Sequence, residues 1–295
     1  MKAFIPAAIT LMFWASSFSG IKQGLEGYSP GHFVLLRFLI ASMVFLLLAV
    51  FTGKIGLPRK RDVGKIFGLA LLGISIYHSF LTFGETVVPA GTAGLLIGSV
   101  PAFTAVFVYL FFKDKLTWMG WLGVLLGFAG VAVISFGTSH GFEFASGAIL
   151  ILIAAISTSL FFIFQQPMFN RYSAIEMTAY FVWFGTIPLL IFIPGFFDAV
   201  ASAPTASTLS GFYLGIFSSG IAYLTWAIAL SNAPASLVTS ALYLDPALAI
   251  VIAWIWLGDL PEPLAFVGGA LTIAGVILVN FYGKEKLPAQ ERKAV

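Results

Sequence analysis

Asp245 is the side chain in this sequence with the clearest potential for chemistry, because a carboxylate stands there within an apolar stretch and directly before Pro246. Counting about 1.5 Å per residue from the ends of that stretch places Asp245 near the middle of a lipid bilayer. A carboxylate at that depth costs at least ~2.5–3.5 kcal/mol, and such residues usually face a wet cavity or a partner. Asp245 is therefore a candidate to bind the positive group of a ligand or to take up a proton. Two structural alternatives are a neutral carboxyl that caps backbone freed by Pro246, and a pair with Arg37.

His78 is expected at a similar depth, and Thr82 and Glu85 follow it at i+4 and i+7 on one helical stripe. That spacing favours a polar track toward one membrane surface. The alternative is a histidine that is hydrogen-bonded to a neighbouring serine or a backbone carbonyl. No metal site is predicted, because the usual ligand spacings are absent around His78 and the chain contains no cysteine. No cofactor is predicted either.

Arg37 is expected about two turns into its apolar stretch. A long arginine side chain there can snorkel to the membrane interface, so we expect a structural role for it.

Aromatic residues make up 16% of the chain, and most of them must serve packing or the interfacial belts. A few aromatic residues coincide in depth with Asp245 and His78 and can line a cavity for an apolar or aromatic ligand, although each is equally a candidate for the core. Together with Ser99 and Ser157, which have similar expected depths, the predicted ligand-binding set is Trp14, Tyr77, His78, Ser99, Ser157, Tyr223, Trp226, Tyr243 and Asp245.

Pro101 and Pro246 interrupt two apolar stretches at related positions. Proline removes a backbone hydrogen bond from a helix, and helices broken at equivalent positions of a repeat commonly mark a binding site in transporters. Because the flanking apolar runs are continuous, we expect a hinge or kink at each proline rather than a full break.

The composition requires elements that cross a membrane. The chain is 60% hydrophobic and only 9% charged, with a mean hydropathy of +1.02, which excludes an ordinary soluble domain. Continuous apolar runs of about 20 residues predict membrane-spanning helices, since lipid leaves backbone groups no other partner. Turn signals and charges divide the chain into ten of them, near 5–24, 31–52, 65–85, 88–112, 118–137, 145–167, 174–197, 209–230, 234–257 and 263–282.

The basic residues set the expected orientation. If the amino terminus is cytoplasmic, thirteen of the fifteen Lys and Arg residues fall in inner turns, the exceptions being Lys22 and Arg37. An excess of Lys and Arg marks cytoplasmic loops, so both termini are predicted inside, with the protein in the inner (plasma) membrane. The lipid bilayer is the expected partner, and no nucleic acid is expected because the basic residues are spread over short turns.

The sequence repeats itself with an offset of 145 residues. This offset places Pro101 on Pro246 and Gly123 on Gly268 without a gap, and Ala129-Gly130-Val131 falls on Ala274-Gly275-Val276. Two units are therefore expected, residues 1–140 and 141–295. Each contains five helices, an odd number, so the second must enter the membrane from the opposite side, and the repeat is predicted to be inverted. Transporters are the commonest use of that arrangement.

The same residues resemble a known family. Pro89-Ala90-Gly91 through Pro101, the run to Gly130-Val131, and Leu257-Gly258-Asp259 are similar to EamA-type proteins of the drug/metabolite transporter superfamily, over nearly all of the chain. The resemblance implies ten helices around a central cavity and movement of amino acids or other small metabolites, commonly as export. Asp245 departs from the family pattern.

Other activities fit the sequence less well. An enzyme is not expected: the Gly73-Ile74-Ser75-Ile76 run lacks the second glycine of a nucleophile elbow, and Asp245 and Asp259 are 14 residues apart, too far for a carboxylate dyad. No Gly-x-x-x-x-Gly-Lys-Ser/Thr motif is present to bind nucleotide. The sequence thus favours a secondary transporter for a small organic molecule, with an amino acid or an aromatic metabolite as substrate and protons as a possible partner. A passive channel or facilitator is the alternative.

Overall fold

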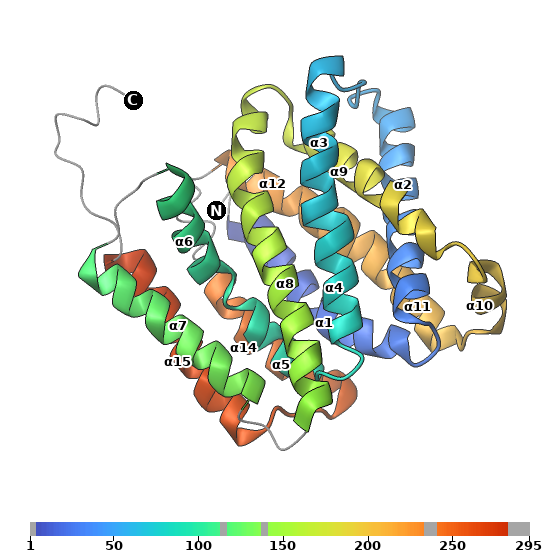
Figure 1. Ribbon diagram of the computed structural model, residues 1–295. Helices are drawn as coiled ribbons and strands as arrows, with labels where there is room; N and C mark the ends of the chain where they lie inside the picture. The colour runs from blue at the N-terminus through green and yellow to red at the C-terminus, as the bar shows by residue number, and fades with distance from the viewer. Residues whose placement is uncertain (1–3, 113–116, 137–140, 233–240, 283–295) are drawn as a thin grey trace, which may run out of the picture.

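The computed structural model describes residues 4–112, 117–136, 141–232 and 241–282, and every regular element in these ranges is helical. Figure 1 shows the long helices packed side by side, with helices of the first half (blue to green) interleaved with those of the second half (green to red).

The helices follow one another in two series. The first half contains α1 (Phe4–Leu25), α2 (Pro30–Thr52), the 3₁₀ turn η1 (Lys60–Asp62), α3 (Val63–Ala70), the π-helix η2 (Leu71–Ile76), α4 (Tyr77–Gly84), α5 (Ala90–Ile97), α6 (Val100–Phe112) and α7 (Trp118–Phe136). The second half contains α8 (Gly141–Gln165), η3 (Gln166–Asn170), α9 (Ala174–Leu189), η4 (Leu190–Phe192), α10 (Phe196–Ser202), α11 (Thr205–Tyr213), the π-helix η5 (Leu214–Ile221), α12 (Ala222–Asn232), η6 (Ala241–Leu244), α14 (Asp245–Leu257) and α15 (Pro263–Tyr282).

Within the described ranges, seven helical segments are long and apolar enough to cross a bilayer, and three shorter apolar helices lie in α7, α14 and α15. Each of them falls on one of the ten ranges expected from the sequence, so the all-helical fold class is confirmed. The predicted helix over 174–197 was wrong at its end. Gly195 has a left-handed φ of 75° and follows Pro194, so the chain turns there and begins the separate helix α10.

Local sequence signals explain several helix ends. Ser29 caps α2 by accepting a hydrogen bond from the His32 backbone N–H, and Pro30 occupies the first turn, where its missing N–H has no cost. Gly53 ends the same helix with a left-handed φ of 61°. Ser173 and Glu176 form a capping box at the start of α9.

The two halves carry the same irregularity at equivalent positions. The π-helix at Leu71–Ile76 and the π-helix at Leu214–Ile221 overlap when the sequence is shifted by 145 residues. The first leads directly into Tyr77 and His78, and the second leads into Tyr223. π-Helical segments are rare and often lie at functional sites, so this pair draws attention to the residues that follow it.

The most extensive helix pair, α7 with α15, is also reciprocal between the halves (Figure 1). A Cβ atom added to Gly123 would lie 2.6 Å from the Gly275 carbonyl oxygen, and one added to Gly130 would lie 2.4 Å from the Gly268 carbonyl oxygen. The 145-residue offset relates Gly123 to Gly268 and Gly130 to Gly275. The same surface of each helix therefore meets its counterpart in the other half, and glycine lets the two backbones approach closely.

The helical hydrogen-bonding pattern is irregular next to Pro101 and next to Pro246. α5 ends at Ile97 and α6 begins at Val100, with a turn at Gly98-Ser99, while Pro246 lies in the first turn of α14 after the 3₁₀ segment η6. Ala90–Phe111 still forms one apolar helical segment of 22 residues, so the helix is irregular next to Pro101 and is not fully broken. Pro101 cannot donate a backbone hydrogen bond to the Ile97 carbonyl four residues earlier. In the same turn the Ser99 hydroxyl donates to the Leu96 carbonyl at 2.6 Å. Apolar composition alone does not reveal such a change of hydrogen-bonding pattern.

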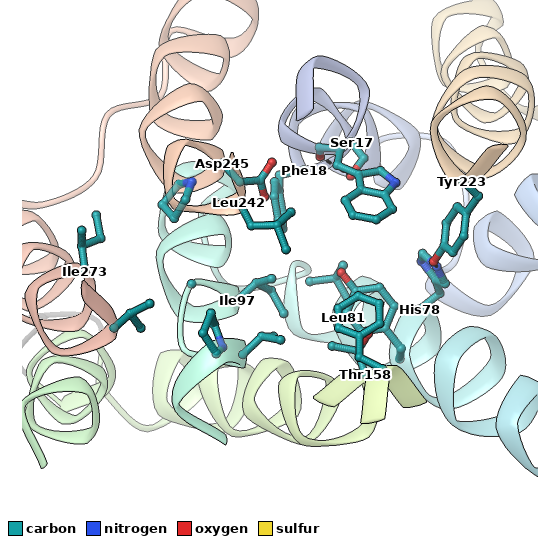
Figure 2. Close-up of a pocket in the computed structure, with 18 of the residues that line it drawn as sticks. Ser17, Phe18, His78, Leu81, Ile97, Thr158, Tyr223, Leu242, Asp245 and Ile273 are labelled. Carbon is teal, nitrogen blue, oxygen red and sulfur yellow. Dashed lines mark hydrogen bonds between the residues drawn. The ribbon is translucent and has the colours of Figure 1, made fainter. Parts of the chain in front are cut away.

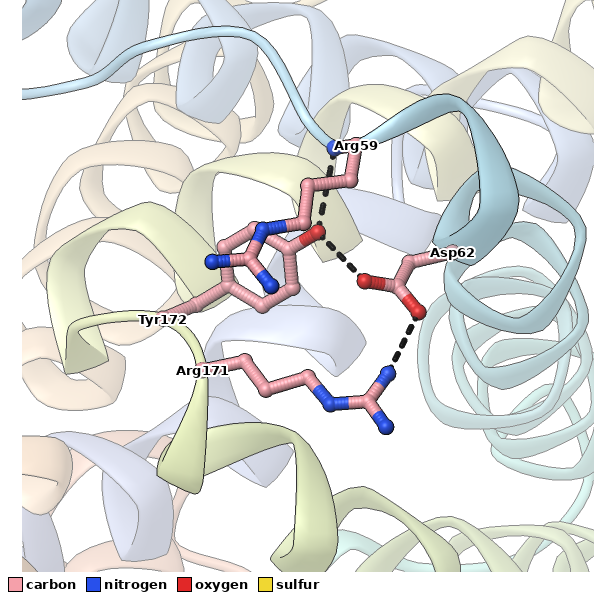
Figure 3. Close-up of polar contacts among 4 residues, drawn as sticks. All are labelled: Arg59, Asp62, Arg171 and Tyr172. Atoms are coloured by element: carbon pink, nitrogen blue, oxygen red, sulfur yellow. Dashed lines mark hydrogen bonds and ion pairs between the residues drawn. The ribbon is translucent and has the colours of Figure 1, made fainter.

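A polar cluster joins two turns at one end of the bundle (Figure 3). Asp62 accepts hydrogen bonds from Arg171 Nη1 at 2.7 Å and from the Tyr172 hydroxyl at 2.8 Å, and the Arg59 backbone N–H donates to the Tyr172 oxygen at 3.0 Å. Burial raises the pKa of the Tyr172 phenol, so this group stays protonated and remains a donor to Asp62. The cluster fixes the start of α3 against the segment that joins α8 to α9.

Candidate substrate cavity

A cavity of about 90 Å³ lies inside the bundle, where the irregular helices α5–α6 and η6–α14 meet α1, α4, α8 and α12 (Figure 2). Its wall is mainly apolar, with a few polar and charged side chains. It is lined by Trp14, Ser17, Phe18, Arg37, Tyr77, His78, Leu81, Ile97, Gly98, Val100, Pro101, Thr158, Phe162, Tyr223, Leu242, Asp245, Pro246, Ile273 and Val276.

Many of these residues are related by the 145-residue offset, so the cavity lies between equivalent parts of the two halves. A cavity bordered by both residues of a repeat-related pair lies close to the axis that relates the two halves. The pairs that line it together are Ser17 with Phe162, His78 with Tyr223, Ile97 with Leu242, Val100 with Asp245, and Pro101 with Pro246.

Asp245 begins α14, and its side chain is only 9% exposed. Among the residues that the structure describes, its Oδ1 atom has no hydrogen-bond partner. Figure 2 shows Asp245 near Leu242 at one side of the cavity, with the His78 and Tyr223 pair at the other. A buried carboxylate oxygen without a donor carries a desolvation cost that a ligand can relieve.

Arg37 reaches the cavity from α2 and is 2% exposed. Its Nε donates to Ser219 Oγ at 2.7 Å and its Nη2 donates to Ser218 Oγ at 3.0 Å, both on the π-helix η5. Its Nη1 has no acceptor in the described ranges. The expected snorkelling of Arg37 to the interface was wrong: the two serines hold the guanidinium inside the bundle, where they replace part of its hydration.

His78 and Tyr223 share a hydrogen bond of 3.2 Å between His78 Nε2 and the Tyr223 hydroxyl. His78 Nδ1 is left without a partner in the described part of the chain. Trp14 packs against the same tyrosine with ring centroids 5.4 Å apart, and against Trp226 at 5.2 Å. This contact makes an aromatic wall from α1 and α12, of which Trp14 and Tyr223 border the cavity.

A smaller cavity of about 20 Å³ lies on the other side of that wall. Trp14, Phe162 and Tyr223 border both spaces, while Trp226 and Gln165 border only the smaller one. The smaller space lies toward the end of α8 and the start of α9, the end of the bundle that carries Asp62 and Arg171. The aromatic wall thus separates the main cavity from that end.

The stripe of His78, Thr82 and Glu85 is buried along its whole length, with exposures of 3%, 1% and 0%. Both carboxylate oxygens of Glu85 lack hydrogen-bond partners among the residues described. Neither Glu85 nor Asp245 forms an ion pair with Arg37 within 4.0 Å in the described ranges.

A model of the EamA-like transporter family matches residues 1–136 and again residues 145–281. The chain belongs to the EamA-like transporter family. The two matches are offset by 144 residues at their starts and 145 at their ends, close to the offset at which the sequence repeats itself.

Curated relatives of this EamA-like transporter agree with the family assignment. The uncharacterized transporter YdfC of Bacillus subtilis is 40% identical over 94% of this chain and 90% of its own length. A probable terminal-alkyne amino-acid exporter of Streptantibioticus cattleyicolor is 37% identical over 95% of this chain and 93% of its own. The uncharacterized inner membrane transporter YedA of Escherichia coli is 29% identical over 95% of this chain and 90% of its own. The chain is therefore a multi-pass membrane protein similar to transporters along its whole length.

A solved structure supports the fold as well. A crystal structure of a protein with 20% sequence identity matches with a TM-score of 0.65, covering 95% of this chain and 99% of the other. At that identity the likeness concerns the fold alone.

The structure brings most of the predicted site residues of this transporter to one place. Trp14, Tyr77, His78, Tyr223 and Asp245 border the cavity, as do Pro101 and Pro246; that they contact a substrate stays a prediction. Trp226 borders only the smaller space. The side chain of Tyr243 lies outside the described part of the chain.

Ser99 and Ser157 do not border the cavity. The Ser99 hydroxyl donates to the Leu96 carbonyl at 2.6 Å, and the Ser157 hydroxyl donates to the Leu72 carbonyl at 2.7 Å. They were predicted from their expected depth in the membrane, and depth says nothing about the direction of a side chain. Thr158, the neighbour of Ser157, borders the cavity instead.

The cavity is also bordered by three residues that were not in the predicted ligand-binding set, namely Arg37, Ser17 and Phe162. The signal for Arg37 was available, since a charged residue within a membrane helix usually faces the bundle interior. Ser17 and Phe162 could have been found together, because Ser17 follows Trp14 by one turn and the 145-residue offset places it on Phe162.

Proposed function

We propose that this EamA-like transporter is a secondary carrier that exports a small organic metabolite by alternating access through the cavity, with an amino acid as the favoured substrate class. The observation that carries the proposal is the position of Asp245. It presents a buried carboxylate with an unpartnered oxygen, within the described ranges, to a cavity formed where the helices of the two halves are irregular.

The architecture behind this proposal is two inverted repeats of five helices, residues 1–140 and 141–295, which place ten helices across the membrane. The paired π-helices and the reciprocal glycine contacts between α7 and α15 support it. In such folds one repeat rocks against the other around a fixed central site, which opens the site alternately to the two sides.

We place both termini in the cytoplasm, and the distribution of Lys and Arg supports this orientation. The end of the bundle with Arg59, Lys60 and Arg171 is then cytoplasmic. The substrate would enter from that end, past the aromatic wall of Trp14, Tyr223 and Trp226, and leave between the outer ends of α1, α4 and α14. The name of the relative from Streptantibioticus cattleyicolor supports both the direction and the substrate class.

In this scheme Asp245 binds the positive group of the substrate or carries a coupling proton. Both roles require the carboxyl group of Asp245 to ionise, and a side chain of the same shape that cannot ionise would not perform them. Asp245→Asn keeps the volume and one oxygen acceptor but cannot ionise. We expect this variant to insert and fold normally, to lose most transport, and to lose whatever pH dependence Asp245 gives the wild-type rate.

The measurement is efflux and counterflow of a panel of radiolabelled amino acids and aromatic metabolites in proteoliposomes, between pH 5 and 8. Asp198→Asn is the matched control, because Asp198 is an exposed carboxylate on α10, away from the cavity. Wild-type rates in Asp245→Asn at every pH would contradict the role given to Asp245. Counterflow that does not saturate, and is not driven by substrate on the other side, would favour a channel or facilitator instead.

A further inference from the structure

Two opposite charges border the cavity, and each retains one polar atom that the protein leaves unused. Arg37 satisfies Nε and Nη2 with Ser219 and Ser218, but Nη1 has no acceptor, and Asp245 Oδ1 has no donor, within the described ranges. Both side chains are buried, at 2% and 9% exposure. An unsatisfied charged group in such surroundings is costly unless something occupies the space beside it.

The two charges do not satisfy each other. No ion pair within 4.0 Å joins Arg37 to Asp245 in the part of the chain that the structure describes. Tyr77 borders the same cavity as both charges. The cation and the anion therefore border one space from separate positions, Arg37 on α2 and Asp245 at the start of α14.

Neither charge has a charged counterpart in the other half. The 145-residue offset relates Arg37 to Val182 on α9 and Asp245 to Val100 on α6. Both valines are buried, at 0% and 7% exposure, in helices that occupy the equivalent places in the other half. Apolar residues thus occupy both equivalent positions, so each charge is particular to the half that carries it, and both border the cavity.

We propose that Arg37 and Asp245 together recognise a zwitterion, a molecule that carries a carboxylate and an ammonium group. Arg37 Nη1 donates to the carboxylate, and Asp245 Oδ1 accepts from the ammonium. The rest of the molecule lies against the apolar wall of Leu81, Ile97, Phe162 and Leu242. This deepens and rests on the proposed function, because it names amino acids with apolar side chains as the substrate class and gives Arg37 a direct part in binding.

The charges of Arg37 and Asp245 also determine which ligands should bind weakly. A simple amine leaves Arg37 Nη1 unpaired, and a simple carboxylic acid leaves Asp245 Oδ1 unpaired. A buried charged group without its partner costs a factor of about ten or more in binding. The cavity should therefore prefer a zwitterion over either molecule that lacks one of the two groups.

The test uses matched ligands that differ by one charged group. L-Phenylalanine is compared with 2-phenylethylamine and 3-phenylpropanoate, and L-leucine is compared with 3-methylbutylamine and 4-methylpentanoate. Affinities are measured by isothermal titration calorimetry on the full-length protein in detergent, for the wild type and for Arg37→Gln, Arg37→Lys and Asp245→Asn. Arg59→Gln and Asp198→Asn are controls that remove the same charges from exposed positions.

We expect the wild type to bind at least one of the two amino acids about tenfold or more tightly than its amine and its acid. Arg37→Gln should weaken binding of that amino acid about tenfold and leave binding of the amine unchanged. Asp245→Asn should also weaken binding of the amino acid about tenfold, but should leave binding of the acid unchanged. A role of either residue in structure alone would weaken all three ligands together. Should Arg37→Gln fail to fold, Arg37→Lys retains the charge and should weaken the amino acid more than the amine.

Equal affinity for the amino acid, the amine and the acid would overturn the proposal, and so would the absence of binding by both amino acids. The same holds if a variant affects the three ligands alike. Binding in detergent is independent of transport, so a protein that binds zwitterions selectively but moves none of them would contradict the proposed function alone.

Discussion

At the scale of single residues, His78 and Tyr223 show how the cavity uses the repeat. The 145-residue offset relates them, and they join the two halves by one hydrogen bond at the cavity wall. The same offset relates Asp245 to Val100 and Arg37 to Val182. Each charged group is therefore present in one half only, whereas the hydrogen-bonded pair takes one residue from each half. The repeat thus supplies the framework, and single substitutions within it give the cavity its polarity.

Tyr223→Phe tests this link between the halves. The variant keeps the ring that packs against Trp14 and removes the hydroxyl, which leaves His78 Nε2 without its partner. We expect the free energy of unfolding to fall by about 1–3 kcal/mol, the cost of a buried polar group left unpaired. Thermal unfolding in detergent measures the change, with Tyr109→Phe on the exposed surface of α6 as control. An unaltered melting temperature would show that the hydrogen bond does not hold the halves together.

Some of the residues that border the cavity could be predicted from the sequence, and others could not. Asp245, His78 and Trp14 were found because depth in an apolar run can be counted along the chain. Ser157 was misplaced because depth does not give direction, and its hydroxyl turns to the Leu72 carbonyl. The position of Arg37 at the cavity was missed for the same reason: its two serine partners lie 181 and 182 residues further along the chain. Contacts over that separation are set by helix packing, which a single sequence does not display.

At the scale of elements, the irregular parts of the helices position the site. The π-helices η2 and η5 lead into His78 and Tyr223, and the interruptions at Gly98-Ser99 and before Asp245 bring backbone and prolines to the cavity. The prolines signalled two of these places, and their pairing across the repeat was readable from the sequence. The π-helices were not, because their sequences are as apolar as the neighbouring turns. The regular helices α7 and α15 instead pack against each other through close glycine contacts between the halves.

Gly130→Ala tests that contact. Its new Cβ atom would lie 2.4 Å from the Gly268 carbonyl oxygen, so α7 and α15 must move apart. We expect a loss of about 1–3 kcal/mol or more in stability, as for other overpacked sites. Gly127→Ala on the same helix is the matched control, because its Cβ atom would approach only the Ala102 side chain, at 3.4 Å. The comparison is read from the two melting temperatures, and equal values would mean that close backbone approach at Gly130 does not stabilise the fold.

At the scale of the whole molecule, the interleaving of the halves gives the cavity two distinct ends. One end carries the Asp62, Arg171 and Tyr172 cluster and the smaller space beyond the aromatic wall. The other carries Lys22 and the buried carboxylate of Glu85. Which end faces the cytoplasm decides whether movement from the smaller space toward Lys22 is export. Orientation is therefore the point on which the direction of transport depends.

The absence of cysteine from the sequence makes orientation directly measurable. Lys60 is exposed at the start of η1, beside the basic cluster, and Asp198 is exposed on α10 at the opposite end, so single cysteines are placed at these two positions. Because Lys and Arg concentrate on the cytoplasmic side, we expect a membrane-impermeant maleimide to label Asp198→Cys in intact cells, and Lys60→Cys only after permeabilisation. Labelling of the opposite cysteine would invert the topology, and the substrate path proposed from the smaller space toward Lys22 would then run inward. Labelling of both in intact cells would mean that the chain inserts in two orientations, in which case the distribution of basic residues does not fix the direction of transport.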